Sequence, residues 1–138
     1  MLTPVQDELQ SRQAAWPKFL AFLERNGGTQ TIERTAEMIG LGISEITEML
    51  DTRKLIFITL RDGQRVIPSF QLASLENFVR VNLILKDSDG EGNCIFYLYP
   101  IMDEGDEMLT PAQILSTKEF AHHIPIVERE ALREAFGF

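Results

Sequence analysis

Two short helical segments around a glycine turn constrain the fold of this chain most strongly. Residues 31–39 repeat apolar side chains at helical spacing, residues 40–42 read Gly-Leu-Gly, and Ser44 can cap a second helix over residues 45–51. The side chains that should face inward are Ile32, Ala36, Ile39, Ile43, Ile46, Met49 and Leu50. Two short helices that flank a tight glycine turn predict a helix-turn-helix.

A β-hairpin signal follows directly. Residues 55–60 are rich in β-forming side chains and predict the first strand. Residues 62–63 read Asp-Gly and predict the turn, and residues 65–68 predict the second, antiparallel strand. An Asp-Gly pair at the centre of a two-residue turn pairs Ile58 with Ile67. The residues predicted to share one buried face are Ile56, Ile58, Leu60 and Ile67. A helix-turn-helix followed by a hairpin is a winged helix-turn-helix arrangement, so we expect a mainly α protein with a β-hairpin.

Helix signals also precede this pair of motifs. Thr3, Pro4 and Gln6 form a capping pattern with proline at the first helical position. Pro17 predicts a kink or a restart, and Asn-Gly-Gly at residues 26–28 ends the helix. The apolar stripe before that end consists of Trp16, Phe19, Leu20, Phe22 and Leu23.

The second half of the chain carries shorter apolar segments between polar loops. Ser74 can cap a helix that runs through Leu85. Alternation within residues 78–85 also fits a strand, and residues 94–99 fit either element. Residues 103–107 are predicted to form an acidic loop.

Two proline starts predict the last helices. Thr110 and Pro111 combine a cap with a first-position proline, and Pro125 starts the final helix. The side chains of the final helix that should face inward are Ile126, Leu132 and Phe136. We therefore divide the chain into residues 1–73, with the helices, helix-turn-helix and wing, and residues 74–138, a small helical protein-binding domain.

The distribution of charge along the chain indicates which partners are favoured. The net charge is −8, and residues 76–138 contribute most of it, with 12 Asp and Glu against 5 Lys and Arg. Such a surface repels nucleic-acid phosphates and anionic membranes, and it either favours a basic protein partner or keeps the chain soluble. No apolar run is long enough to span a membrane, and residues 1–10 lack a secretory pattern, so we expect a cytoplasmic protein.

Four basic residues around the hairpin are the candidate contacts to nucleic acid: Arg53, Lys54, Arg61 and Arg65. Arg61 and Arg65 should point to opposite faces of an ideal hairpin, which disfavours a single patch. The second helix of the helix-turn-helix carries Glu45, Glu48 and Asp51 and no Lys or Arg. Base readout normally uses Arg, Lys, Asn or Gln, so this helix disfavours DNA binding.

No motif in the chain predicts catalysis or metal binding. Residues 87–93 resemble the start of a calcium loop, but Leu98 stands where a bidentate glutamate is needed. His122 and His123 are adjacent and should diverge on a helix, while Cys94 is a single cysteine among apolar residues. We therefore expect a non-enzymatic protein without a metal or another cofactor.

The order of these motifs resembles a known family. Residues 36–55, followed by residues 65–71, which end in Pro-Ser-Phe-Gln, look like the head of small bacterial antitoxin-like proteins. Residues 95–100, followed by residues 109–115, are similar to the toxin-binding domain of MbcA/ParS/Xre-type antitoxins. The resemblance covers residues 31–138 and implies a mainly helical protein that binds and blocks a RES-type toxin, an enzyme that consumes NAD.

One departure from that family concerns the residues before the Thr-Pro pair. Met108 and Leu109 stand where the family often has Gly-Arg, so the contact of that arginine is absent or inverted. In the toxin-binding interpretation, the final helix and the C-terminal aromatic residues lie on the partner. The residues predicted to bind the partner are Thr110, Pro111, Arg129, Arg133, Phe136 and Phe138.

Three functions therefore stay open. The first is an antitoxin-like protein that binds and blocks a toxin or another protein. The second is a transcription regulator of the winged helix-turn-helix type, which binds DNA. The third is an acidic inhibitor or scaffold that mimics nucleic acid, and a homo-oligomer is compatible with all three.

Overall fold

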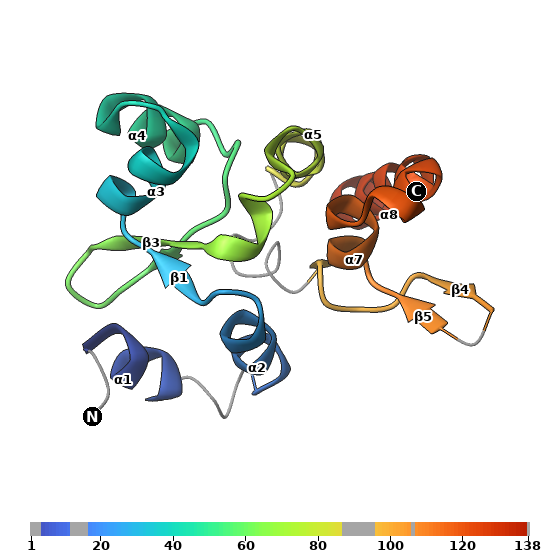
Figure 1. The fold of residues 1–138 in the computed structure, drawn as a ribbon, viewed down its shortest axis with the longest axis horizontal. Helices are drawn as coiled ribbons and strands as arrows, with labels where there is room; N and C mark the ends of the chain where they lie inside the picture. The colour runs from blue at the N-terminus through green and yellow to red at the C-terminus, as the bar shows by residue number, and fades with distance from the viewer. Residues whose placement is uncertain (1–3, 12–16, 87–95, 106, 138) are drawn as a thin grey trace.

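The computed structural model describes residues 4–11, 17–86, 96–105 and 107–137, and within them the chain is mainly helical with small antiparallel sheets (Figure 1). The elements in chain order are α1 (Pro4–Ser11), α2 (Pro17–Arg25), β1 (Thr29–Gln30), α3 (Ile32–Ile39), α4 (Ile43–Asp51), β2 (Ile58–Thr59), β3 (Arg65–Pro68), the 3₁₀ turn η1 (Ser69–Gln71), α5 (Leu75–Leu85), β4 (Met102–Glu104), β5 (Glu107–Leu109), α7 (Pro111–Ser116), the 3₁₀ turn η2 (Lys118–His123) and α8 (Ile124–Phe136). The predicted restart at Pro17 is confirmed, because α2 begins there.

Caps fix the two helices around the glycine turn. The Thr31 hydroxyl accepts the Arg34 N–H at 3.0 Å, and Gly40 ends α3 with a left-handed φ of 73°. The predicted cap at Ser44 is wrong, since α4 begins at Ile43 with Gly42 as its N-cap residue. The Gly42 N–H instead donates to the Glu45 carboxylate at 3.3 Å.

The hairpin forms with a register one residue away from the predicted one. Ile58 pairs with Val66 rather than with Ile67, because residues 61–63 make a three-residue turn in which Gly63 has a φ of 89°. A one-residue shift turns each side chain to the other face of the strand. Val66 therefore joins Ile58 in the main core, and Ile67 packs with the buried residues of α3 and α4.

A two-residue strand that the sequence pattern did not indicate completes this sheet. β1 pairs with β3, so the strand order is β1-β3-β2 and α3 and α4 lie between β1 and β2 along the chain. The Ser69 N–H also donates to the Gly28 carbonyl at 3.0 Å, which extends the join between the two segments. The sheet thus ties the start of α3 to the end of the hairpin.

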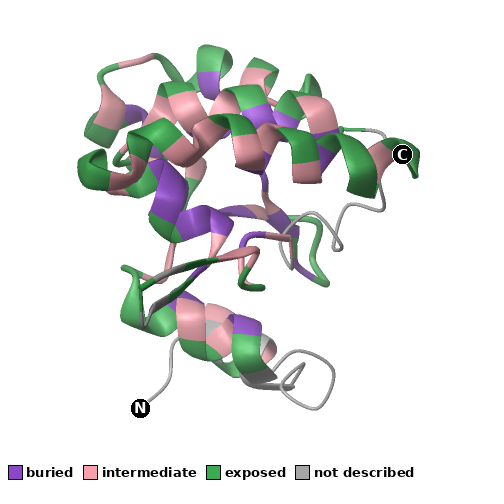
Figure 2. Cartoon of the chain, turned by 90° about the vertical axis from the view of Figure 1, so that its right-hand side faces the viewer, coloured by how far each residue is buried: buried purple, intermediate pink, exposed green. Residues whose placement is uncertain are grey.

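One main core draws on both sides of the predicted boundary at residues 73 and 74. Phe19, Val66 and Phe70 come from the N-terminal side, and Phe78 and Tyr97 come from the C-terminal side. The rings of Phe70 and Phe78 lie 5.5 Å apart, edge to face, and Tyr97 contacts both. Figure 2 marks the buried positions along the elements in purple.

The ambiguous segment after Ser74 is a helix. α5 ends at Leu85 and buries Phe78, Val81 and Leu85, so the strand alternative is wrong. Residue 96 lies in a helical turn and residues 97–99 form a turn, while residues 87–95 lie outside the described residues. The calcium-like loop and Cys94 are therefore not among the described parts.

Two expectations for the C-terminal part are wrong. The acidic segment forms a hairpin of β4 and β5 rather than a loop, with Met102 opposite Leu109. On α8 the buried residues are Val127 and Ala131, while Leu132 and Phe136 are exposed. α5 packs against α8, and both Val127 and Ala131 belong to the main core.

Candidate protein-binding surfaces

Two of the four predicted nucleic-acid contacts meet at the base of the hairpin. The Arg53 and Arg65 guanidinium groups lie 5.2 and 5.3 Å from the centre of the Phe57 ring. Arg65 also forms an ion pair with Asp51 at 2.8 Å. This pair links the hairpin to the end of α4 and offsets part of the positive charge that a phosphate would meet.

The other two predicted contacts do not join that group. The Arg61 N–H, in the hairpin turn, donates to both carboxylate oxygens of Glu8 at 3.1 and 3.0 Å. The Lys54 carbonyl accepts the Asn82 amide at 2.9 Å and so belongs to the buried side of its segment. Arg53 and Arg65 therefore meet on one ring, whereas the main-chain bonds of Arg61 and Lys54 tie those two positions to α1 and α5.

The outward side of α3 and α4 is acidic. Glu33 and Glu37 are exposed on α3, and Glu45 and Glu48 are exposed on α4. The one base on these two helices, Arg34, is paired with Glu37 at 3.0 Å. Negative charge on this side opposes binding to nucleic-acid phosphates.

Ile43 adds an apolar group to the same helix pair. It is 53% exposed although it was expected to face inward, because it occupies the first position of α4, before the helix meets the core. Ile43 shares the side of α4 with the buried Ile46, so it does not lie with Glu45 and Glu48. We name the set Glu33, Glu37, Glu45 and Glu48 the acidic face.

Two of the predicted partner-binding residues hold α7 in place. The Thr110 hydroxyl accepts the Gln113 N–H at 3.2 Å, and the Gln113 carboxamide oxygen accepts the Thr110 N–H at 2.9 Å. Pro111 is buried at the first position of the helix. Pro111 is therefore closed to a partner, while the half-buried Thr110 already serves as the cap of α7.

Three further predicted residues share one outward side of α8. Arg129, Arg133 and Phe136 are exposed, and Leu132 lies between them at the same helical spacing. Leu132 and Phe136 are 40% and 55% exposed. We name the set Arg129, Leu132, Arg133 and Phe136 the α8 face; Phe138 lies outside the described residues.

Leu132 is the member of the α8 face that the sequence pattern predicted to lie inward. The sequence nevertheless held a signal, because Val127 and Ala131 define an alternative inward stripe. With that stripe inward, Leu132 and Phe136 fall together on the outer side, next to Arg129 and Arg133. Figure 2 shows exposed residues along the helix that leads to the C-terminus.

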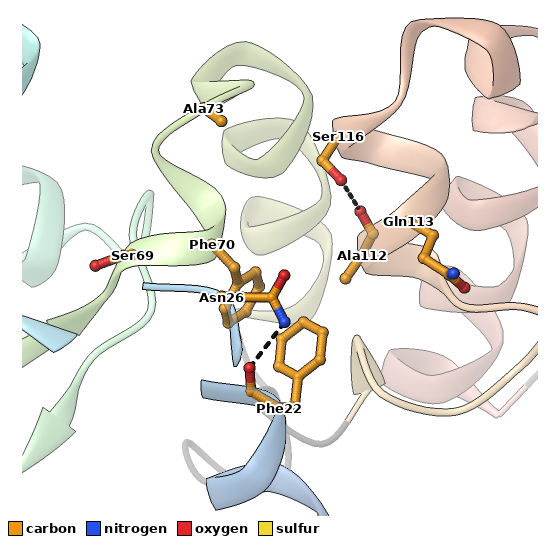
Figure 3. Close-up of a pocket in the computed structure, with 8 residues that line it drawn as sticks. All are labelled: Phe22, Asn26, Ser69, Phe70, Ala73, Ala112, Gln113 and Ser116. Atoms are coloured by element: carbon orange, nitrogen blue, oxygen red, sulfur yellow. Dashed lines mark hydrogen bonds between the residues drawn. The ribbon is translucent and has the colours of Figure 1, made fainter. Parts of the chain in front are cut away.

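A small pocket lies between α2, η1 and α7. Its volume is about 220 Å³, and Figure 3 shows the Phe22 and Phe70 rings beside the Asn26 amide at its centre. Its lining residues are Phe22, Asn26, Ser69, Phe70, Ala73, Ala112, Gln113 and Ser116. Most of its polar groups already bond within the chain, as the Asn26 amide does to the Phe22 carbonyl at 2.8 Å and the Ser116 hydroxyl to the Ala112 carbonyl at 2.6 Å.

The histidine pair does not diverge as expected. The His122 and His123 rings lie 3.9 Å apart at the end of η2. Among residues 4–11, 17–86, 96–105 and 107–137, no three His, Cys, Asp or Glu side chains gather as a metal site would need. No helix in these segments is both long enough and apolar enough to cross a membrane.

Comparison with known proteins gives no assignment: no family model, no curated protein and no solved structure matches this chain.

Proposed function

We propose that this protein is a non-enzymatic, antitoxin-like protein that binds and blocks a protein partner through the α8 face. One observation carries the proposal: Leu132 and Phe136, 40% and 55% exposed, lie beside two arginines on a single side of α8. Exposed apolar side chains grouped with arginine are typical of the centres of protein–protein interfaces.

The packing of α8 supports a surface that is ready to bind. Val127 and Ala131 fix the inner side of the helix in the core, and Glu128 pairs with Arg80 of α5 at 2.7 Å. The outer side is therefore held in one orientation before a partner arrives. A preformed surface loses little conformational entropy on binding, which favours affinity.

The head is proposed to be a winged helix-turn-helix. Its elements follow the order helix, strand, two helices, strand, strand from α2 to β3, and the first strand closes on the last one. The acidic face of α3 and α4 supports a role for this head in contacts with protein rather than with DNA.

The motifs that suggested an antitoxin have physical roles in this fold, which supports the resemblance. Phe70 stacks in the main core, and Gln71 bonds to Ile56 and Asn82. Thr110 caps α7. By analogy, the proposed partner class is an NAD-consuming toxin of the RES type.

A direct experiment measures NAD consumption by a RES-type toxin from the same cell as the chain is added. We expect the unchanged chain to inhibit, and the variant Leu132→Ser/Phe136→Ser to need at least about tenfold more protein for the same inhibition. The control is Tyr99→Ser/Met108→Ser, since these residues are at least as exposed, at 55% and 57%, but lie outside α8. The absence of inhibition by the unchanged chain would reject the toxin as partner.

A DNA-binding regulator is the second candidate. The observation that favours it is the pair Arg53 and Arg65 on the Phe57 ring at the base of the wing. A regulator should bind duplex DNA with an affinity that falls steeply as salt rises, and Arg53→Gln/Arg65→Gln should weaken that binding. DNA binding that is insensitive to both changes would reject this candidate.

A further inference from the structure

We infer that the pocket between α2, η1 and α7 binds a small, neutral aromatic molecule of about the size of indole that carries an N–H or O–H group. The inference goes beyond the proposed function, because it concerns a different part of the molecule. Its test contains no protein partner, so either proposal can fail while the other stands.

Two aromatic walls form the pocket. The Phe22 and Phe70 rings meet edge to face, with their centroids 5.0 Å apart and an angle of 71° between the ring planes. A flat ligand ring can therefore stack on one wall while its edge meets the other. Phe70 is buried and also contacts Phe78 and Tyr97, so the main core holds this wall in place before a ligand arrives.

The volume of the pocket sets the size of its ligand. An apolar cavity of about 150 Å³ accommodates benzene, and this pocket has a volume of about 220 Å³. It therefore has room for a single ring or for two fused rings. Pockets for drug-sized ligands begin at about 300 Å³, so a larger molecule does not fit within the walls.

The chemistry of the lining favours a neutral ligand. The eight described residues that line the pocket carry no charge. A phosphate or a carboxylate would lose hydration there without gaining an oppositely charged partner. The aromatic walls and the absence of charge from these eight residues together favour an uncharged aromatic compound.

Asn26 is the polar group at the centre of the pocket. Its side-chain amide donates to the Phe22 carbonyl at 2.8 Å, and this bond fixes the orientation of the carboxamide. The carboxamide oxygen points away from that carbonyl, and no group among the described residues donates to it (Figure 3). The Ser116 hydroxyl gives its proton to the Ala112 carbonyl at 2.6 Å, so its oxygen can only accept from a ligand. The pocket therefore suits a ligand that brings a hydrogen-bond donor.

The other two polar side chains of the lining are already engaged. The Ser69 hydroxyl donates to the Gly27 carbonyl at 3.2 Å. The Gln113 oxygen accepts the Thr110 N–H at 2.9 Å, and the Gln113 side chain turns away from the two rings (Figure 3). The Asn26 oxygen is therefore the acceptor that a ligand between the rings meets.

The test is a titration of the full chain with indole, followed by heteronuclear NMR of the backbone and side-chain amides. N-Methylindole is the matched probe, because it keeps the ring system and lacks the N–H donor. Asn26→Leu removes the acceptor at a similar side-chain volume, and Ala73→Phe fills the exposed rim of the pocket. Ala121→Phe places the same ring at an exposed position of η2 outside the lining and serves as the control.

We expect saturable shifts at the lining residues of the parent and of the control, with a dissociation constant for indole on the order of 1 mM or below. N-Methylindole should bind the parent at least about fivefold more weakly, and Asn26→Leu should bind both probes equally. Ala73→Phe should weaken indole binding at least about tenfold, because its ring occupies the space of the ligand.

The NMR spectrum of each variant identifies any that fails to fold, and the comparison of the two probes on the parent needs no variant. Three results would overturn the inference. They are the absence of saturable shifts at the lining, equal affinity of the parent for the two probes, and indole binding by a folded Ala73→Phe variant at the affinity of the parent.

Discussion

Gln71 shows how one side chain holds three segments of this protein together. Its carboxamide oxygen accepts the Ile56 N–H at 3.0 Å and the Asn82 amide at 3.2 Å. Its amide group donates to the Ile56 and Pro68 carbonyls at 2.9 and 3.2 Å. Tyr97 donates its hydroxyl proton to Asn82, so the network extends to the segment before the C-terminal hairpin. Each of these groups is buried, and its partner is supplied within the chain.

The substitution Gln71→Leu keeps the side-chain volume and removes four hydrogen bonds. The Ile56 N–H and carbonyl are then buried without partners, so we expect the free energy of unfolding to fall by about 2–4 kcal/mol. Urea unfolding measures the change. Gln64→Leu, at an exposed position in the hairpin turn, should cost well under 1 kcal/mol and serves as the control. Equal effects of the two changes would show that the buried network contributes little.

At the scale of elements, Thr110 serves as the N-cap residue of α7. The sequence pattern predicted it both as a cap and as a partner contact, and its hydroxyl accepts the Gln113 N–H. Thr110→Ala removes that acceptor, and we expect a loss of about 0.5–2 kcal/mol in the free energy of unfolding. Thr110→Ser retains the oxygen and should stay close to the parent. Thermal unfolding measures the stability of both variants. If a folded, stable Thr110→Ala variant lost partner binding, Thr110 would be a direct contact to the partner.

Strong local signals allowed most of the helices to be predicted. Proline starts, threonine caps and glycine ends act within one turn of the chain, and they placed α2, α3 and α7 correctly. The short strands gave no such signal, because β1, β4 and β5 have two or three residues and no periodicity. Their pairing depends on contacts between segments that the tertiary fold brings together.

The errors at Ile58 and Leu132 have the same origin. Asp-Gly fits a two-residue and a three-residue turn, and burial of Val66 beside Ile58 selects the longer one. On α8 the largest apolar side chains were predicted to be inward, but packing in the main core buries Val127 and Ala131 instead. In both cases tertiary packing chooses between local patterns that fit the sequence equally well, and at α8 this choice creates the candidate site.

At the scale of the whole molecule, the main core links the predicted head to the predicted binding domain. Phe70 packs on Phe78 and Tyr97, and Ile56 bonds to Gln71, which in turn bonds to Asn82 of α5. The acidic face and the α8 face are therefore held at fixed positions by one continuous interior.

This continuity predicts that neither part folds alone. A fragment of residues 1–73 loses the cover of Phe78, Val81 and Tyr97, and a fragment of residues 74–138 loses that of Phe19 and Phe70. We expect the intact chain to unfold in one cooperative transition, and each fragment to give a broad, non-cooperative melt by circular dichroism. An equimolar mixture of the fragments should regain part of the cooperative signal, because the missing core contacts are then supplied from the other fragment. Cooperative melting of either fragment by itself would instead show that the boundary at residues 73 and 74 separates independent domains.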